Sequence, residues 1–435
     1  MRDRFPLAKV FALHAGELPV EYSSPPDSYW YPGSGISINN FLESEIPDCD
    51  AKDILLLEWR PALSVYGKSY LSLIEASVEF IKRIDANTRT TRAFGSRWFK
   101  NFIKNLITVK KIIHPEVISR QILITGAGPS LETAIDLIKS EKLNFYTLAT
   151  ASSVPALEAQ GLIPDLLIST DGGNWAKYHL NECLRSCHTM PLAISLTGTL
   201  PSQCEDFPLL LMANGSLWQS LILNELKIPH IILPSRGTVT ASALDLAFAL
   251  TGENIFIAGM DLANDDIRSH ARPYSFDRFF EDKENRFTPF YSQTYSRSSL
   301  LKQGKSFGIY ANWFKTNMDF YPRPIYSLGT NNPVFNSISP SLSLLPLPSK
   351  KNNENLLDDF NIVQVNSADN LSQRALAILE KKLREEASFQ ETSGASIEET
   401  PFCILHRELS SLLYPGETNI TSDDLIKGIY SGASG

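Results

Sequence analysis

The sequence has few cysteines, no basic excess and no hydrophobic run of the length that a membrane helix requires. Its five cysteines are odd in number and widely separated among 435 residues, so a disulfide-stabilised fold is not expected. The net charge of −8 argues against nucleic-acid binding, which usually needs a basic surface. A membrane helix takes about 20 apolar residues, and no such run is present. We therefore expect a soluble protein of a reducing compartment, with no nucleic-acid partner.

A resident metal is also not expected. Cys183 and Cys187 are one helical turn apart and His188 follows directly, but zinc ligation requires a further well-spaced pair of ligands. Buried, unpaired cysteines fit this pattern better than a metal site does.

What is present is enough hydrophobic sequence, 43% of the chain, for a large core and more than one domain. We expect a small α/β or mostly helical domain over 1–115, which includes a buried strand at Asp53–Trp59. A core domain follows over 116–335, and the Pro- and Ser-rich residues 336–366 are typical of a linker. Residues 367–435 should form a helical extension whose last part is weakly packed.

The core domain has a regular pattern of short apolar segments that alternate with helical ones. Such strands predict a parallel sheet covered on both faces, and right-handed crossovers make it a doubly wound, Rossmann-like α/β fold. Residues 264–325, rich in Arg, Tyr, Phe and Ser, interrupt the pattern and are expected to face a substrate. The seven expected strands are Ile122–Ala127, Phe145–Thr150, Asp165–Thr170, Pro191–Leu196, Pro208–Asn214, His230–Pro234 and Asn254–Asp261.

Small and polar residues follow nearly every expected strand, where the ligands of parallel sheets bind. The turn at Gly126, Gly128, Pro129 and Ser130 suits a phosphate, because glycine admits close approach and a helix N-terminus offers free N–H groups. It has neither the third glycine of a dinucleotide fingerprint nor the lysine of a P-loop. A plain strand-to-helix turn therefore stays an alternative.

Two acidic residues, a hydroxyl-rich turn and one histidine complete the candidate site. Asp171 lies at a strand end and is followed by Gly172. Its carboxylate is a candidate ligand for a ribose hydroxyl or for Mg²⁺, and the alternative is an ordinary Asx turn. Asp261 has the same location, and His270 is a candidate general acid or base. Ser235, Gly237 and Thr238 form a second expected phosphate turn, and Arg236 within it is either a phosphate ligand or a surface residue.

Taken together, these segments resemble the motility accessory factor family. The resemblance rests on ITGAGPSLE, GLIPDLLISTDGG, SRGTVTASALDLAFAL and GMDLA followed by SHA, in this order, and covers roughly 50–330. The core of that family is the MptE-like domain, also called 6-hydroxymethylpterin pyrophosphokinase-like. It is also similar to bacterial sialyltransferases that use CMP-sialic acid.

The resemblance implies a bacterial cytoplasmic glycosyltransferase. It would move a nonulosonic, sialic-like acid from a CMP-activated donor to serine or threonine of a flagellin-type protein, with no permanently bound cofactor. The resemblance assigns Asp261 and His270 to the transfer. Ala127 and Leu262–Ala263 depart from the sialyltransferase pattern, which leaves Tyr274 and Tyr310 as candidates for a tyrosine's role. The resemblance places the donor phosphate at two turns, formed by Gly126, Gly128, Pro129, Ser130 and by Ser235, Gly237, Thr238.

Two other functions stay open. The pterin branch of the family implies a pyrophosphokinase that uses ATP with Mg²⁺, held by Asp171 and Asp261. A non-enzymatic, nucleotide-binding flagellar accessory protein would share the same fold, because one α/β scaffold hosts many functions.

Overall fold

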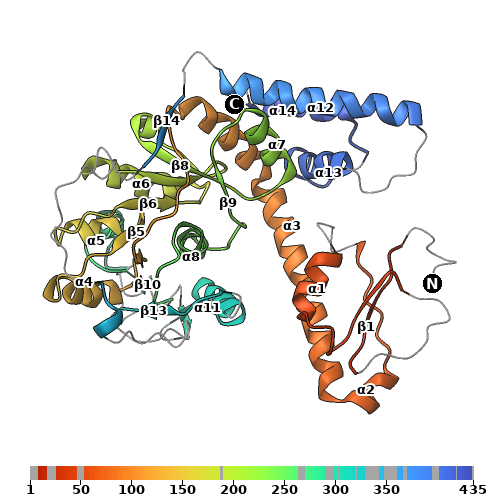
Figure 1. The fold of residues 1–435 in the computed structure, drawn as a ribbon, viewed down its shortest axis with the longest axis horizontal. Helices are drawn as coiled ribbons and strands as arrows, with labels where there is room; N and C mark the ends of the chain where they lie inside the picture. Colours follow the sequence, from red (N-terminus) through yellow and green to blue (C-terminus); the bar gives the residue numbers. More distant parts are fainter. Residues whose placement is uncertain are drawn as a thin grey trace. The chain divides into compact units, whose positions relative to one another are not determined.

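The chain forms two compact units, Met1–Gly95 and Ser96–Gly435, and each is described by itself (Figure 1). Among the described residues, no helix is both long and apolar enough for a membrane span. This computed structural model describes residues 8–16, 26–46, 53–186, 190–262, 270–287, 289, 298–300, 303–318, 321–328, 342–346, 360–365, 370–393, 401–417 and 419–433.

The first unit, which ends at Gly95 and not at residue 115, contains both strands and helices. Its two short strands are parallel, and Phe41, Leu42 and Phe80 form its core. The expected strand at Asp53–Trp59 is wrong, because these residues are irregular and Trp59 is 74% exposed. The run is mostly leucine, and Ile54 is its one β-branched residue, so its preference for a strand is weak. The elements are β1 (Phe11–Leu13), β2 (Ser28–Trp30), α1 (Ile38–Glu45), α2 (Pro61–Tyr66) and α3 (Lys68–Thr108), which continues into the second unit.

The second unit is built on a ten-stranded sheet in the order β13-β10-β4-β5-β6-β7-β8-β3-β14, with β9 beside β8. All neighbours are parallel except β14 and β3. The predicted mostly parallel, doubly wound sheet is therefore confirmed. The strands are β3 (Lys111–Ile113), β4 (Ile122–Thr125), β5 (Tyr146–Thr150), β6 (Leu166–Ser169), β7 (Leu192–Ser195), β8 (Pro208–Ala213), β9 (Ile231–Ile232), β10 (Ile255–Ala258), β13 (Ile325–Ser327) and β14 (Ile362–Gln364).

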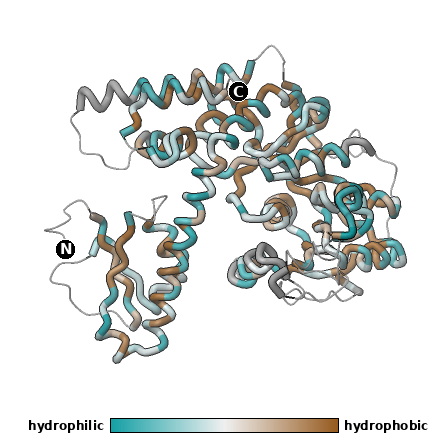
Figure 2. The backbone as a smooth tube through the Cα atoms, turned by 180° about the vertical axis from the view of Figure 1, so that it is seen from behind, coloured by the Kyte–Doolittle hydropathy of each residue, from teal (hydrophilic) through white to brown (hydrophobic). Residues whose placement is uncertain are grey.

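Apolar residues on both faces of the strands hold the sheet between two helical layers. In β4, Ile122 and Ile124 belong to one buried cluster and Leu123 to the other, as strand alternation requires. One layer contains α4 (Ser130–Ser140), α5 (Val154–Glu158), α6 (Asn174–Ser186), α7 (Leu217–Glu225) and the end of α3. The other contains α8 (Val239–Leu250), hydrophobic along most of its length (Figure 2), and α11 (Lys305–Asn317).

The C-terminal helices are part of the core, so the expectation of weak packing is wrong. They are α12 (Leu371–Ser393), α13 (Pro401–Leu413) and α14 (Ser422–Ala433), and their leucines are buried with α7. Glu408 of α13 accepts hydrogen bonds at 3.0 Å from the backbone N–H groups of Leu217 and Trp218. A carboxylate at this helix start satisfies N–H groups that have no partner within the helix.

The chain reverses direction across the sheet between β4 and β10. From β4 it proceeds to β5, and from β10 it proceeds the opposite way to β13. Such a reversal leaves a crevice at the carboxyl ends of the two strands, where α/β proteins bind ligands. The fold thus places the Gly126–Ser130 turn and Asp261 on either side of this switch point.

Candidate functional site

A cavity of about 330 Å³ lies at the carboxyl ends of β4, β5, β6 and β10. This volume is at the lower end of the range for small-molecule sites. Six of the eleven residues predicted for the site line it, namely Gly126, Gly128, Asp171, Thr238, Asp261 and His270. The other five, Pro129, Ser130, Gly172, Ser235 and Gly237, are not among its lining residues.

The glycines after β4 are explained by a close crossing of two loops. The Gly128 N–H donates to the Gly259 carbonyl at 2.7 Å, and the Gly126 N–H donates to Ala258 at 2.8 Å. A Cβ atom on Gly126 would lie 2.5 Å from the Gly259 oxygen, and one on Gly128 would lie 2.8 Å from it. Gly259 itself has φ +66°, which favours glycine. Loop packing therefore requires these glycines whether or not a ligand binds.

Asp261 caps the helix that follows the glycine turn. Its Oδ2 accepts a hydrogen bond at 2.8 Å from the Ser130 N–H, at the start of α4. The carboxylate thus occupies the helix N-terminus that a phosphate was expected to use. A phosphate that bound the Ser130 N–H would have to displace Asp261.

The loop after β6 contains the Asx turn that was one alternative for Asp171. Asp171 lines the cavity, and its Oδ1 accepts a hydrogen bond from the Gly173 N–H at 2.8 Å.

Two asparagines of α3 hold the neighbouring loop after β7. Asn101 donates to the Thr197 carbonyl at 3.0 Å, and Asn105 donates to Leu196 at 2.8 Å and to Gly198. Sequence reasoning missed both, although they recur one turn apart on the apolar face of a helix.

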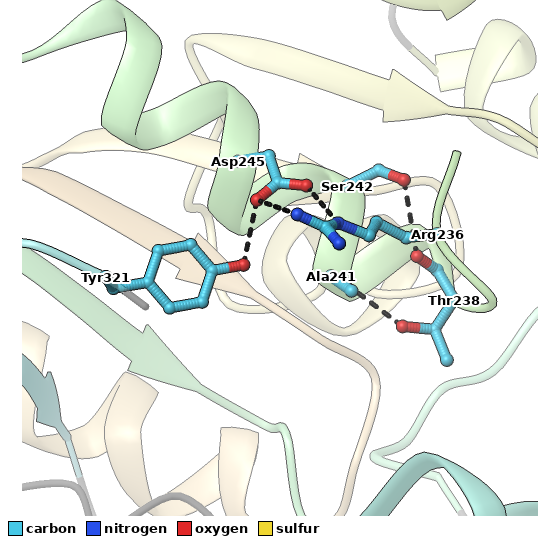
Figure 3. Close-up of polar contacts among 6 residues, drawn as sticks. All are labelled: Arg236, Thr238, Ala241, Ser242, Asp245 and Tyr321. Atoms are coloured by element: carbon cyan, nitrogen blue, oxygen red, sulfur yellow. Dashed lines mark hydrogen bonds and ion pairs between the residues drawn. The ribbon is translucent and has the colours of Figure 1, made fainter. Parts of the chain in front are cut away.

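The turn before α8 is held by an internal ion pair (Figure 3). Arg236 Nε lies 2.5 Å from Asp245 Oδ2, and the Tyr321 hydroxyl donates to Asp245 Oδ1 at 2.8 Å. Burial and the adjacent Asp245 raise the pKa of Tyr321. Arg236 is therefore partly buried and held by Asp245, which competes with any phosphate for its guanidinium.

Thr238 begins α8 as its N-cap, with its Oγ1 accepting from the Ala241 N–H at 3.0 Å (Figure 3). It lines the cavity together with Val239 and Thr240. The positive end of the α8 dipole therefore lies at this wall.

Two histidines and a tyrosine form a further part of the cavity lining. The ring of His270 stacks on Tyr274 at a centroid separation of 3.8 Å, and the Tyr274 hydroxyl is 3.4 Å from His179 Nε2. The Ala271 N–H donates to the Ala127 carbonyl at 2.8 Å, which ties this segment to the glycine turn. His179 was missed, because a single histidine within α6 has no distinguishing pattern.

Burial makes both imidazoles weak bases. It lowers the pKa of His179 to about 4, although Asp171 acts in the opposite direction. It also lowers the pKa of His270 to about 4, and His179 lowers it further. Both rings are therefore neutral at pH 7.

The described residues contain no group of three or more His, Cys, Asp and Glu that could hold a metal ion. Asp171 and Asp261 both line the cavity, but each has one carboxylate oxygen bound to a backbone N–H. Cys183 is buried and its thiol contacts the Ala151 carbonyl at 3.1 Å, whereas Cys187 and His188 lie outside the described residues.

Comparisons with known proteins agree with the predicted resemblance over the middle of the chain. Residues 96–266 match the family model described as 6-hydroxymethylpterin diphosphokinase MptE-like. Two uncharacterized proteins of Treponema pallidum (strain Nichols) are similar: one is 26% identical over 280 residues, and the other is 29% identical over 116 residues. The first match covers 64% of this chain and 60% of the relative, and the second covers 26% and 55%.

A solved structure of a Maf glycosyltransferase from Magnetospirillum magneticum AMB-1 is 15% identical, with a TM-score of 0.47. The match covers 83% of this chain and 57% of that one. The chain thus spans less than two thirds of the length of these proteins.

Proposed function

We propose that this protein is a glycosyltransferase. The proposal starts from the match of residues 96–266 to the MptE-like family model. The protein would transfer a nonulosonic acid from a CMP-activated donor to a serine or threonine hydroxyl of a flagellin-type protein. The observation that carries the proposal is the cavity at the switch point. Its lining includes both the start of α8 and the neutral ring of His270.

The phosphate of the donor is assigned to the start of α8, at Thr238–Thr240, beside the Gly126–Gly128 turn. In the reaction, the acceptor oxygen attacks the anomeric carbon and the bond from that carbon to the phosphate oxygen breaks. The electron pair of this bond leaves with CMP. The proton of the attacking hydroxyl passes to His270.

His270 is assigned the role of base, because it lacks the proton that an acid must give. A general acid must carry a proton before the reaction, and burial keeps this imidazole unprotonated at pH 7. Its stacking on Tyr274 holds the ring in one orientation. Positioning of this kind is a large part of the rate that such a base contributes.

The test measures CMP release with a CMP-activated nonulosonic acid and a flagellin-type acceptor. His270→Ala should lower kcat by about 10²–10⁴-fold, the usual contribution of a general base. His406→Ala is the matched control, because His406 lies on α13, outside the cavity lining, and its pKa is also lowered by burial. Unchanged CMP release in His270→Ala would show that the mechanism is wrong.

A pyrophosphokinase is the second candidate, favoured by the description of the matching family and by the two acidic residues of the cavity. It predicts strict dependence on ATP and Mg²⁺, with loss of activity in Asp171→Asn. Binding of CMP or ATP in a calorimeter without any turnover would instead favour a non-enzymatic accessory protein.

A further inference from the structure

The cavity presents a charge problem to any phosphate-bearing ligand. Its described lining contains two carboxyl groups, Asp171 and Asp261, and neither lysine nor arginine. Arg236, which lies in the Ser235–Thr238 turn before α8, is paired with Asp245. An anion that enters such a site without a compensating charge is strongly disfavoured. The groups of the lining that can become positive are the imidazoles of His179 and His270.

We propose that His179 takes up a proton when a phosphate-bearing ligand enters the cavity, and so becomes the cation of the binding site. The inference rests on the ligand class of the proposed function and adds a residue to its site. His179 would bind and neutralise the phosphate, while His270 remains the neutral base.

The surroundings of His179 favour it over His270 as the proton acceptor. Its Nδ1 is buried without a hydrogen-bond partner, and its Nε2 is 3.4 Å from the Tyr274 hydroxyl. A neutral imidazole donates from one nitrogen and an imidazolium from both, so protonation of His179 adds a second, charged donor. Unpartnered buried nitrogens of this kind are costly and call for an explanation.

The titratable groups around the pair also favour a single proton. On the loop after β6, Asp171 stabilises a charge on His179. His270 contacts the same tyrosine, Tyr274, and is disfavoured from charging by His179, so a proton on one ring opposes a proton on the other. Asp261, Tyr274 and Tyr310 are the other titratable groups among the described lining residues.

The sign of the resulting pH dependence follows from linkage. The pKa of His179 is about 4 without ligand and rises when an anion binds beside it. The bound state therefore holds more protons, and affinity must increase as pH falls. One linked proton gives at most about a tenfold change in Kd per pH unit, between the free and the bound pKa.

Calorimetry with CMP tests the proposal directly. Titrations of the full chain at pH 7, with EDTA, are run in two buffers of different ionisation enthalpy, so that the difference in heat counts protons. We expect uptake of about one proton per CMP bound. Cytidine, which has the same base but no phosphate, should bind with no proton uptake.

His179→Gln should abolish both the proton uptake and the pH dependence of CMP binding, while cytidine binding is kept. His406→Gln, outside the cavity lining, should leave both unchanged. Binding of CMP by the wild-type protein without proton uptake, or only with Mg²⁺, would overturn this inference alone. Failure of CMP to bind at any pH from 6 to 8 would overturn the proposed function as well. The wild-type measurement decides even if the variant does not fold.

Discussion

The cavity is bounded by two kinds of turn that are held in place in different ways. The loops after β4 and β10 cross in direct backbone contact, where the Gly128 N–H donates a hydrogen bond to the Gly259 carbonyl. The turn into α8 is instead held by side chains, with Asp245 bound to Arg236 and to Tyr321 (Figure 3). A backbone crossing tolerates no added atoms, whereas a side-chain contact can be lost while the chain path remains. The first kind should therefore be the less tolerant of substitution.

Gly259→Ala is expected to have the largest effect. The new Cβ would overlap the Gly126 carbonyl oxygen and lie 2.8 Å from Leu131 Cβ, and φ +66° adds backbone strain. Overlap with backbone cannot be relieved by rotating a side chain, so we expect a loss of about 4 kcal/mol in unfolding free energy. Urea unfolding of the full chain, followed by circular dichroism, measures the loss.

Gly252→Ala is the matched control, because a Cβ there would meet no atom within 4 Å. It should change the unfolding free energy by less than about 0.5 kcal/mol. Equal losses in the two variants would mean that the crossing does not hold the site.

The parts of the fold that were predictable are those with a strong local pattern. The expected strands Ile122–Ala127 and Asn254–Asp261 appear as β4 and β10, because continuously apolar runs are typical of a doubly covered sheet. The three-residue strands β3, β13 and β14 had no such pattern, and each is fixed by pairing with a neighbour distant in the sequence. The packing of α13 on α7 was likewise missed, since Glu408 and its partners lie about 190 residues apart.

Asp245→Ala should be the next largest in effect. It leaves Arg236 and the Tyr321 hydroxyl without the carboxylate that both contact, and the Asp245 side chain is only 8% exposed. We expect a loss of about 2 kcal/mol, below the value for a fully buried pair because the Arg236 side chain is 26% exposed. Thermal unfolding of the full chain measures the loss.

The exposed pair of Lys82 and Glu79 provides the comparison for this variant, with side chains 66% and 72% exposed. Glu79→Ala should be nearly neutral, as exposed ion pairs contribute little. A similar loss from both substitutions would contradict the structural importance of the Asp245 contacts.

The site was predictable in its location and less so in its chemistry. Small residues after strands correctly placed the cavity at the strand ends, because that rule depends on topology alone. The partners of each residue are not local in sequence: Asp261 contacts Ser130, 131 positions away, and His179 contacts Tyr274. The sequence therefore could not show that a predicted phosphate donor is already occupied, or that a second histidine lies in the same wall.

Asp261→Asn should have the smallest effect on stability and the most informative effect on binding. The amide oxygen can still accept from the Ser130 N–H, so only the charge–dipole part of the cap, about 0.5 kcal/mol, is lost. Removal of one negative charge from the cavity should strengthen CMP binding by about fivefold, equivalent to about 1 kcal/mol. A pyrophosphokinase that held Mg²⁺ through Asp261 would instead lose nucleotide binding in this variant. Calorimetric Kd values for the wild-type protein and for Asp261→Asn, with and without Mg²⁺, therefore separate a carboxylate that competes with the phosphate from one that binds its metal.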